Sequence, residues 1–115
     1  MNETIDLLTN HRTYRQFDSN YQLSKEQLEA ILSAARQAPS WMNGQAYSIL
    51  VIDDRSLRQQ LVTWNPGNPH IAESSIFLLF LADLNRTKKV AEKKQTPYLV
   101  DEGLQPLLIA TTDAS

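Results

Sequence analysis

The chain has 115 residues, and its 11 lysines and arginines against 13 aspartates and glutamates give a formal net charge of −2. That balance argues against a protein that coats nucleic acid, which needs a concentrated basic face. The absence of cysteine excludes disulfides, thiolate metal sites and a cysteine nucleophile, and two histidines are too few for a histidine-rich zinc site.

The sequence predicts neither a membrane span nor a dinucleotide-binding glycine motif. Its longest apolar run, residues 76–82, is far shorter than the ~20 residues that cross a bilayer. The N-terminus carries acids and no basic group, unlike a signal peptide, so we expect a cytoplasmic protein. Only three glycines occur and none belongs to a G-x-G-x-x-G loop, which argues against a Rossmann domain.

Two helices are expected in the N-terminal third of the chain. The first is short and covers residues 2–8. The second begins after Ser24, because Gln27 stands three residues later and completes the pattern of a capping box. Pro39 ends it, since the residue before a proline avoids the helical region. Apolar side chains at helical spacing mark its expected core-facing stripe: Leu28, Ile31, Leu32 and Ala35.

Two short apolar segments, residues 47–52 and 76–82, predict buried β-strands, the first of them central in its sheet. Residues 64–69 are rich in asparagine, proline and glycine and predict a loop between the strands. The chain therefore mixes helices with few strands, which favours the α+β class.

Further helices are expected on either side of the second strand. One is capped by Asp53 or Asp54 and runs to about residue 62. A lysine-rich helix covers residues 85–94 and is followed by a loop through Pro97. The first of these helices turns three apolar side chains inward: Leu57, Leu61 and Val62. Two acidic pairs are interpreted as helix caps and solvated surface: Asp53 with Asp54, and Asp101 with Glu102.

Residues 11–15 concentrate hydrogen-bond donors in a short segment beyond a helix end. His11, Arg12, Thr13 and Arg15 offer guanidinium, hydroxyl and imidazole groups, which suit a phosphate or another polyoxygen anion. Taken alone, the segment is more typical of a solvated surface with ion pairs than of an anion site.

A second polar segment, residues 38–45, follows the capped helix. Uncharged hydrogen-bonding side chains alternate there with Trp41 and Met42, an arrangement that can hold a planar heteroaromatic ring. The alternative is an ordinary connection from helix to strand, with Trp41 and Met42 filling the core.

In combination, the segments resemble the nitroreductase family of flavin (FMN) oxidoreductases. The order is HRTYRQF, the SKEQL helix, APSWMNGQ and the strand YSILVID, followed by NPGNPHIAESSIFLLFLADLNR and EGLQPLLIATTDA. The similarity covers most of the chain and lies closest to the branch of oxygen-insensitive NADPH nitroreductases and flavin reductases.

The resemblance implies which residues contact FMN. His11, Arg12 and Thr13 match contacts to the phosphate and ribityl chain, and Arg15 matches a cation at the N1/C2-carbonyl edge of the flavin. Asn68 matches a polar side chain on the pyrimidine side, where the branch commonly has glutamine. A loop that reaches the flavin of the partner subunit corresponds to Pro39, Ser40, Trp41 and Asn43. Gln45 occupies a motif position with a cofactor-binding or a bracing role.

The resemblance also implies the fold and the reaction. The expected fold is a nitroreductase-like mixed sheet flanked by helices, with residues 1–115 as the N-terminal part of a single domain. Family members are about twice as long, and the remainder holds a glycine-rich loop and further phosphate contacts. The implied reaction is two-electron transfer from NAD(P)H through FMN to a nitroaromatic, a quinone or free flavin, in a homodimer. Such chemistry requires no catalytic acid, base or metal from the protein.

Two other interpretations stay open. The last helix begins near Leu104 and lacks a terminating residue before Ser115, so its leucines need a surface to pack against. This favours a truncated, non-catalytic domain that self-associates. Residues 11–15 alone would make an anion-binding module.

Overall fold

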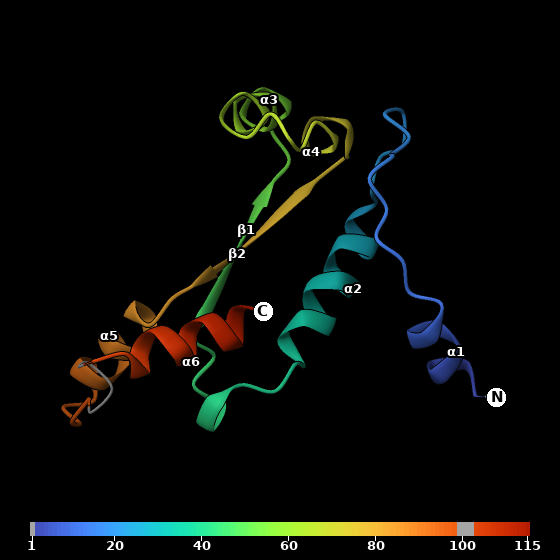
Figure 1. Cartoon of the computed structure of the whole chain (residues 1–115). Coiled ribbons are helices and arrows are strands. Elements are labelled where there is room, and N and C mark those ends of the chain that lie inside the picture. The colour runs from blue at the N-terminus through green and yellow to red at the C-terminus, as the bar shows by residue number, and fades with distance from the viewer. Residues whose placement is uncertain (1, 99–102) are drawn as a thin grey trace.

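A computed structural model describes residues 2–98 and 103–115 and shows an α+β arrangement of helices around a β-ribbon (Figure 1). The predicted fold class is therefore confirmed. The elements, in chain order, are α1 (Glu3–Thr9), α2 (Lys25–Arg36), the 3-10 helix η1 (Trp41–Asn43), β1 (Tyr47–Ile52), α3 (Arg55–Trp64), α4 (His70–Glu73), β2 (Phe77–Ala82), α5 (Asn85–Lys93) and α6 (Gln105–Ala114).

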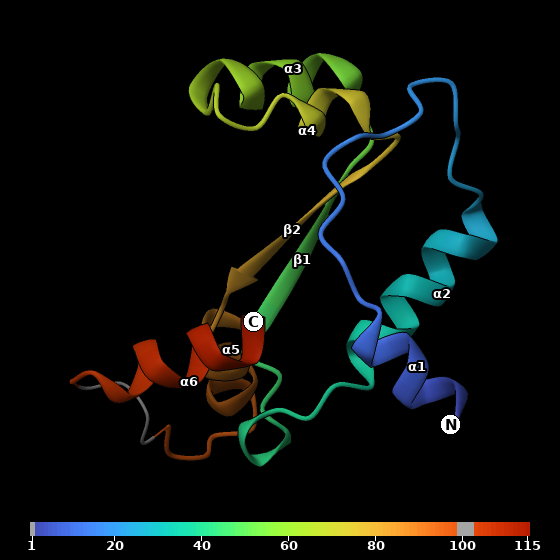
Figure 2. The same ribbon diagram turned by 45° about the vertical axis from the view of Figure 1, so that its right-hand side comes forward.

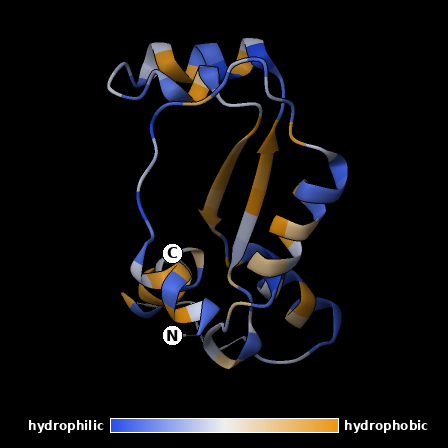
Figure 3. Ribbon diagram, turned by 90° about the vertical axis from the view of Figure 1, so that its right-hand side faces the viewer, coloured by the Kyte–Doolittle hydropathy of each residue, from blue (hydrophilic) through white to orange (hydrophobic). Residues whose placement is uncertain are grey.

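The described part of the sheet is an antiparallel pair, with β1 and β2 in register from Tyr47 opposite Ala82 to Ile52 opposite Phe77. β2 is apolar along its length, and β1 is apolar after its first two residues (Figure 3). The prediction that they are buried holds at Tyr47 and Ile52 and was wrong at the other strand positions, because the helices pack mainly at the two ends of the ribbon. The exposed strand residues are Leu50, Val51, Phe80, Leu81 and Ala82.

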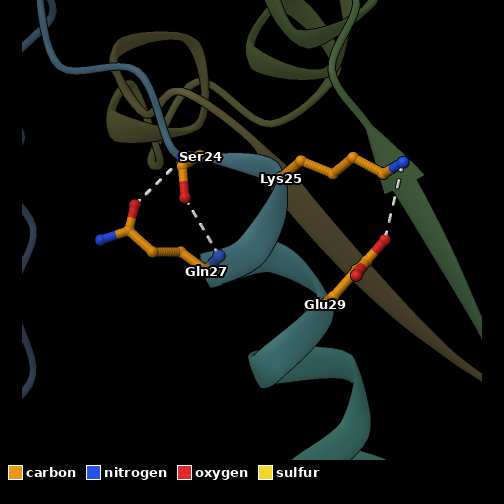
Figure 4. A network of polar contacts seen from close by, with 4 residues as sticks. All are labelled: Ser24, Lys25, Gln27 and Glu29. Carbon is orange, nitrogen blue, oxygen red and sulfur yellow. Dashed lines mark hydrogen bonds and ion pairs between the residues drawn. The ribbon is translucent and has the colours of Figure 1, made fainter.

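The capping box predicted for α2 is confirmed (Figure 4). The Gln27 amide donates to Ser24 Oγ at 3.1 Å, and the Ser24 amide donates to Gln27 Oε1 at 3.0 Å. An ion pair between Lys25 and Glu29 at 3.8 Å is exposed and adds little stability. The apolar stripe of α2 lies on one face, but none of its residues is buried and Ile31 is exposed.

At one end of the ribbon lie α3 and α4 (Figures 1 and 2). Asp54, one of the two predicted caps, accepts a hydrogen bond from the Leu57 amide at 2.9 Å. Leu57 itself was predicted to face inward and is exposed, whereas the neighbouring Arg58 is buried. The short helix α4 directly follows the predicted loop of residues 64–69 and was not foreseen.

At the other end lie α5 and α6, and α6 packs against both strands (Figure 2). Ile109 and Ala110 of α6 pack with Ala46 and Leu84 into a small apolar cluster. The predicted helices over residues 85–94 and beyond Leu104 are confirmed by α5 and α6. The acidic pair Asp101 and Glu102 lies outside the described residues.

The folded chain is extended for its size. Its radius of gyration is 17.5 Å, whereas a compact chain of this length has a radius of about 13 Å. Its accessible surface is 9257 Å², against about 6,400 Å² for a compact monomer of the same mass. Much apolar surface therefore faces outward. Among the helices that the structure describes, none is long and apolar enough to cross a membrane.

Candidate functional site

The donor-rich segment after α1 is an exposed stretch without regular secondary structure. Arg12 Nη1 donates to the carbonyls of His11 at 2.8 Å and Thr9 at 3.4 Å, so its cation sits at the C-terminal end of α1. Within residues 2–98 and 103–115, the side chains of Thr13 and Arg15 have no hydrogen-bond or ionic partner. Their donors are available to a ligand.

This segment leads to the end of the ribbon that holds α4. The ring of Phe17 lies 6.3 Å from the ring of His70, centroid to centroid, and the Leu23 amide donates to Ser75 Oγ at 3.1 Å. Asn68 lies in the turn just before α4, where its amide donates to the Asn65 carbonyl at 3.1 Å. The predicted pyrimidine-side residue is thus near the C-terminal end of the donor-rich segment.

The second predicted segment folds into a tight loop around η1, which we call the η1 loop, residues 39–46. Ser40 Oγ accepts a hydrogen bond from the Gln45 amide at 3.1 Å, and the Gly44 amide donates to the Trp41 carbonyl at 2.8 Å. The backbones of Met42, Asn43 and Gln45 have positive φ angles of 48°, 55° and 49°. The left-handed region is unfavourable for residues other than glycine, so neighbouring groups must hold this loop in place.

Those neighbouring groups come from α5 and α6. Thr87 Oγ1 donates to the Gly44 carbonyl at 3.1 Å, and Arg86 Nη2 donates to the Gln45 carbonyl at 2.5 Å. Asp113 of α6 accepts from two loop amides, those of Trp41 at 3.0 Å and Ala46 at 3.2 Å. The sequence interpretation missed all three residues. For Asp113 a signal exists, because an acid in the last turn of a helix opposes the helix dipole.

The start of α5 is fixed by a carboxylate. The Ser48 hydroxyl donates a short hydrogen bond to Asp83 Oδ2, and the Asn85 amide donates to Asp83 Oδ1 at 3.0 Å. The Ser48 hydrogen bond lowers the pKa of Asp83 below its ordinary value of 3.8, helped by the backbone amides and the charge of Arg86. Asp83 thereby connects β1 to the helix that holds the η1 loop.

The two predicted halves of the site lie apart within one chain. The η1 loop adjoins the end of the ribbon covered by α6, and Asn68 lies at the opposite end (Figure 1). A hollow of about 390 Å³ is lined by Pro39, Ser40 and Trp41 together with α6. A separate hollow of about 400 Å³ is lined by Phe17, Tyr21 and the residues before β2. Neither hollow contains residues of both segments.

The chemistry of the site residues fits an organic anion. The donor-rich segment offers guanidinium and hydroxyl groups, as a phosphate-bearing cofactor requires. In the described part of the chain, no group of three or more histidine, aspartate or glutamate residues is placed to hold a metal ion. The arrangement can therefore bind and orient a cofactor, and the reacting atoms would belong to that cofactor.

Comparisons with known proteins show which family and which proteins this chain resembles. The model of the nitroreductase family matches residues 8–100. The chain is 34% identical to an FMN reductase [NAD(P)H] of Bacillus subtilis over 115 residues, which cover 99% of the chain and 46% of that protein. It is 39% identical over 95 residues to an oxygen-insensitive NADPH nitroreductase of Salmonella typhimurium, covering 83% of the chain and 39% of that enzyme.

A solved structure agrees with these sequence matches. B. megaterium NfrA2 superimposes with a TM-score of 0.92 at 35% identity, over 99% of this chain and 46% of the other. The chain thus spans about half the length of the relatives that it matches.

Proposed function

Because the chain belongs to the nitroreductase family, we propose that residues 1–115 are the N-terminal part of a single nitroreductase-like domain. The complete protein would bind FMN and pass two electrons from NAD(P)H to a nitroaromatic, a quinone or free flavin. The supporting relatives are an FMN reductase and a nitroreductase, each matched over less than half of its own length.

The observation that carries the proposal is the set of available donors on the segment after α1. Thr13 and Arg15 are exposed and make no hydrogen bond or ion pair within the described residues, so their donors are open to a ligand. His11, Arg12 and Thr13 would hold the phosphate and ribityl groups. Arg15 would place its charge at the N1/C2-carbonyl edge, where it favours the reduced flavin over the oxidised one.

FMN, when bound, would supply the hydride-accepting and hydride-donating ring. The protein would bind that ring, orient it and limit its contact with water. Asn68 would support the pyrimidine side, since its turn lies near the end of the donor-rich segment. Gln45 would brace the η1 loop, because its amide and side chain bond to Ser40 and Asn43 of the same loop.

The separation of the two predicted segments supports a homodimer. The η1 loop, which carries Pro39, Ser40, Trp41 and Asn43, lies at the far end of the ribbon from Asn68. Neither of the two hollows described above is lined by residues of both segments. In a two-fold symmetric dimer, the η1 loop of one subunit would complete the site of the other.

The test is a titration of the purified chain with FMN, followed by flavin fluorescence. We expect Arg15→Ala to weaken FMN binding by about tenfold or more, because a charge-assisted hydrogen bond contributes about 1.5–3 kcal/mol. Arg55→Ala is the matched control, since this exposed arginine lies on α3 and outside both segments. Equal affinity of the Arg15→Ala and Arg55→Ala chains would contradict the assignment of Arg15.

A second candidate function is favoured by the apolar residues of α6. The exposed fraction is 72% for Leu104, the residue before α6, and 61% and 64% for Leu107 and Leu108 within it. A chain that self-associates through this segment and binds no FMN would be a non-catalytic fragment. The titration with unmodified chain distinguishes the two candidates, because only the first predicts saturable FMN binding.

A further inference from the structure

Asp113 occupies a position that helix electrostatics disfavour. It lies in the last turn of α6, where the exposed carbonyls repel a negative charge. Two backbone amides of the η1 loop compensate for this. The Trp41 amide donates to Oδ1 at 3.0 Å and the Ala46 amide donates to Oδ2 at 3.2 Å.

The two amides mark the ends of the strained part of the loop. Met42, Asn43 and Gln45, the residues with positive φ, all lie between Trp41 and Ala46. Residues other than glycine adopt this backbone region at an energetic cost, so the loop keeps this shape only while its ends are held. Ala46 is 1% exposed, and its buried amide has no other partner in the described part of the chain.

Only a carboxylate can accept both hydrogen bonds. Asparagine has the same shape but a single acceptor oxygen, and its NH₂ group would face one of the two donating amides. The loop carbonyls are held separately by Arg86 and Thr87 of α5. Asp113 therefore controls the amide side of the loop, while the attachment to α5 is independent of it.

We propose that Asp113 is a positioning residue that fixes the η1 loop in the conformation that presents Trp41 and Asn43 to the flavin. The inference rests on the proposed function for the identity of the ligand. The statement that Asp113 fixes the conformation of the η1 loop does not depend on that function, because the shape of the loop is measurable without any cofactor. Trp41 and Asn43 are both exposed in this conformation and free to meet a molecule outside the chain.

The first measurement is amide hydrogen exchange of the cofactor-free chain. In Asp113→Ala we expect exchange at Trp41 and Ala46 to accelerate by at least about tenfold, since each loses a hydrogen bond to a charged group. In Asp113→Asn only one of the two amides should keep its protection. The control is Asp54→Ala, which removes a carboxylate that accepts a backbone amide in α3. It should leave exchange at Trp41 and Ala46 unchanged.

The second measurement is the FMN titration, made with the same chains. We expect Asp113→Ala and Asp113→Asn to weaken FMN binding at least about threefold, with Asp54→Ala binding as the unmodified chain does. Should Asp113→Ala fail to fold, the asparagine variant decides, because it preserves volume and one hydrogen bond. Unchanged exchange at both amides would overturn the inference, and so would faster exchange with unaltered FMN affinity.

The outcomes separate the inference from the function on which it rests. If the unmodified chain binds no FMN, the assignment of FMN contacts to the residues of this chain fails, and with it the role of Asp113 toward the flavin. If FMN binds and Arg15→Ala abolishes binding while both Asp113 variants match the unmodified chain, the function stands and the inference about Asp113 fails.

Discussion

Asp83 joins three elements through a single carboxylate. It follows β2, accepts the Ser48 hydroxyl of β1 and accepts the Asn85 amide at the start of α5. These hydrogen bonds favour the ionised form, and the first of them is the main reason that the pKa of Asp83 is lowered. A carboxylate that is stabilised in the folded state makes stability depend on pH.

We expect Asp83→Asn to remove part of the acid sensitivity of the chain. The folded pKa is lower than the unfolded value, near 3.8, so the contribution of Asp83 is fully present above that value. It is lost as the pH falls through the folded pKa. Urea unfolding between pH 7 and pH 3 should show the variant less stable at neutral pH and the difference shrinking in acid. Asp53→Asn is the control, because no partner of its carboxylate is described; a constant difference for Asp83→Asn would contradict the prediction.

The residue-scale features that could be predicted from the sequence are those with local partners. Ser24 and Gln27 are three residues apart, so their reciprocal capping is visible in the sequence. Asp113 bonds to amides 72 and 67 residues away. An acid in the last turn of a helix is a signal in the sequence, but no local pattern identifies the partners of that acid. The FMN contacts assigned to His11, Arg12, Thr13, Arg15 and Asn68 came from the resemblance and stay predictions.

The junction between β1 and α3 depends on a buried arginine. Arg58 is 6% exposed, and its Nη1 atom donates to the Asp53 carbonyl at 2.5 Å and the Ile52 carbonyl at 3.4 Å. These carbonyls lie where the strand ends and the helix begins. The guanidinium thus satisfies backbone carbonyls between β1 and α3, where the chain belongs to neither the strand nor the helix.

We expect Arg58→Ala to lower the free energy of unfolding by about 1–3 kcal/mol, because it leaves buried carbonyls without a donor. The matched control is Arg55→Ala, an exposed arginine one turn earlier in α3, which should change stability by no more than about 0.5 kcal/mol. Chemical denaturation of both variants checks this. Equal effects would show that Arg58 acts only as a surface charge.

At the level of elements, periodicity located most helices and both strands. The predicted helix over residues 85–94 agrees with α5 to within one residue, because its ends coincide with changes in composition. The four-residue α4 was missed, since it is too short for a periodic pattern and has no side-chain cap. Burial of the strands was predicted wrongly because apolar composition does not reveal which faces the rest of a structure covers.

The whole molecule presents more surface than a chain of its mass usually does. The excess agrees with the large radius of gyration and with a buried set of only a few apolar residues among those described. Large exposed apolar patches generally mark interaction surfaces. Adjacent exposed leucines lie on two described helices, Leu107 and Leu108 on α6 and Leu7 and Leu8 on α1.

We expect the chain to self-associate through α6 and the double variant Leu107→Ser, Leu108→Ser to shift it toward monomer. Each serine removes exposed apolar area that contributes about 25 cal/mol per Å² when buried. Size-exclusion chromatography with light scattering over a concentration series measures the change. Leu7→Ser with Leu8→Ser is the control, because these leucines are 75% and 71% exposed on α1. A monomeric unmodified chain, or equal effects of both variants, would contradict the prediction.

The connection between the paired strands has a consequence for how the chain folds. β1 and β2 are joined by all of α3 and α4 instead of a tight turn. Bringing the ends of so long a connection together costs on the order of 3 kcal/mol of chain entropy. The packing of α3 against α4 shortens the effective connection. We therefore expect the helical pair to form first and the strands to zip together late, as they do in other topologies dominated by distant contacts.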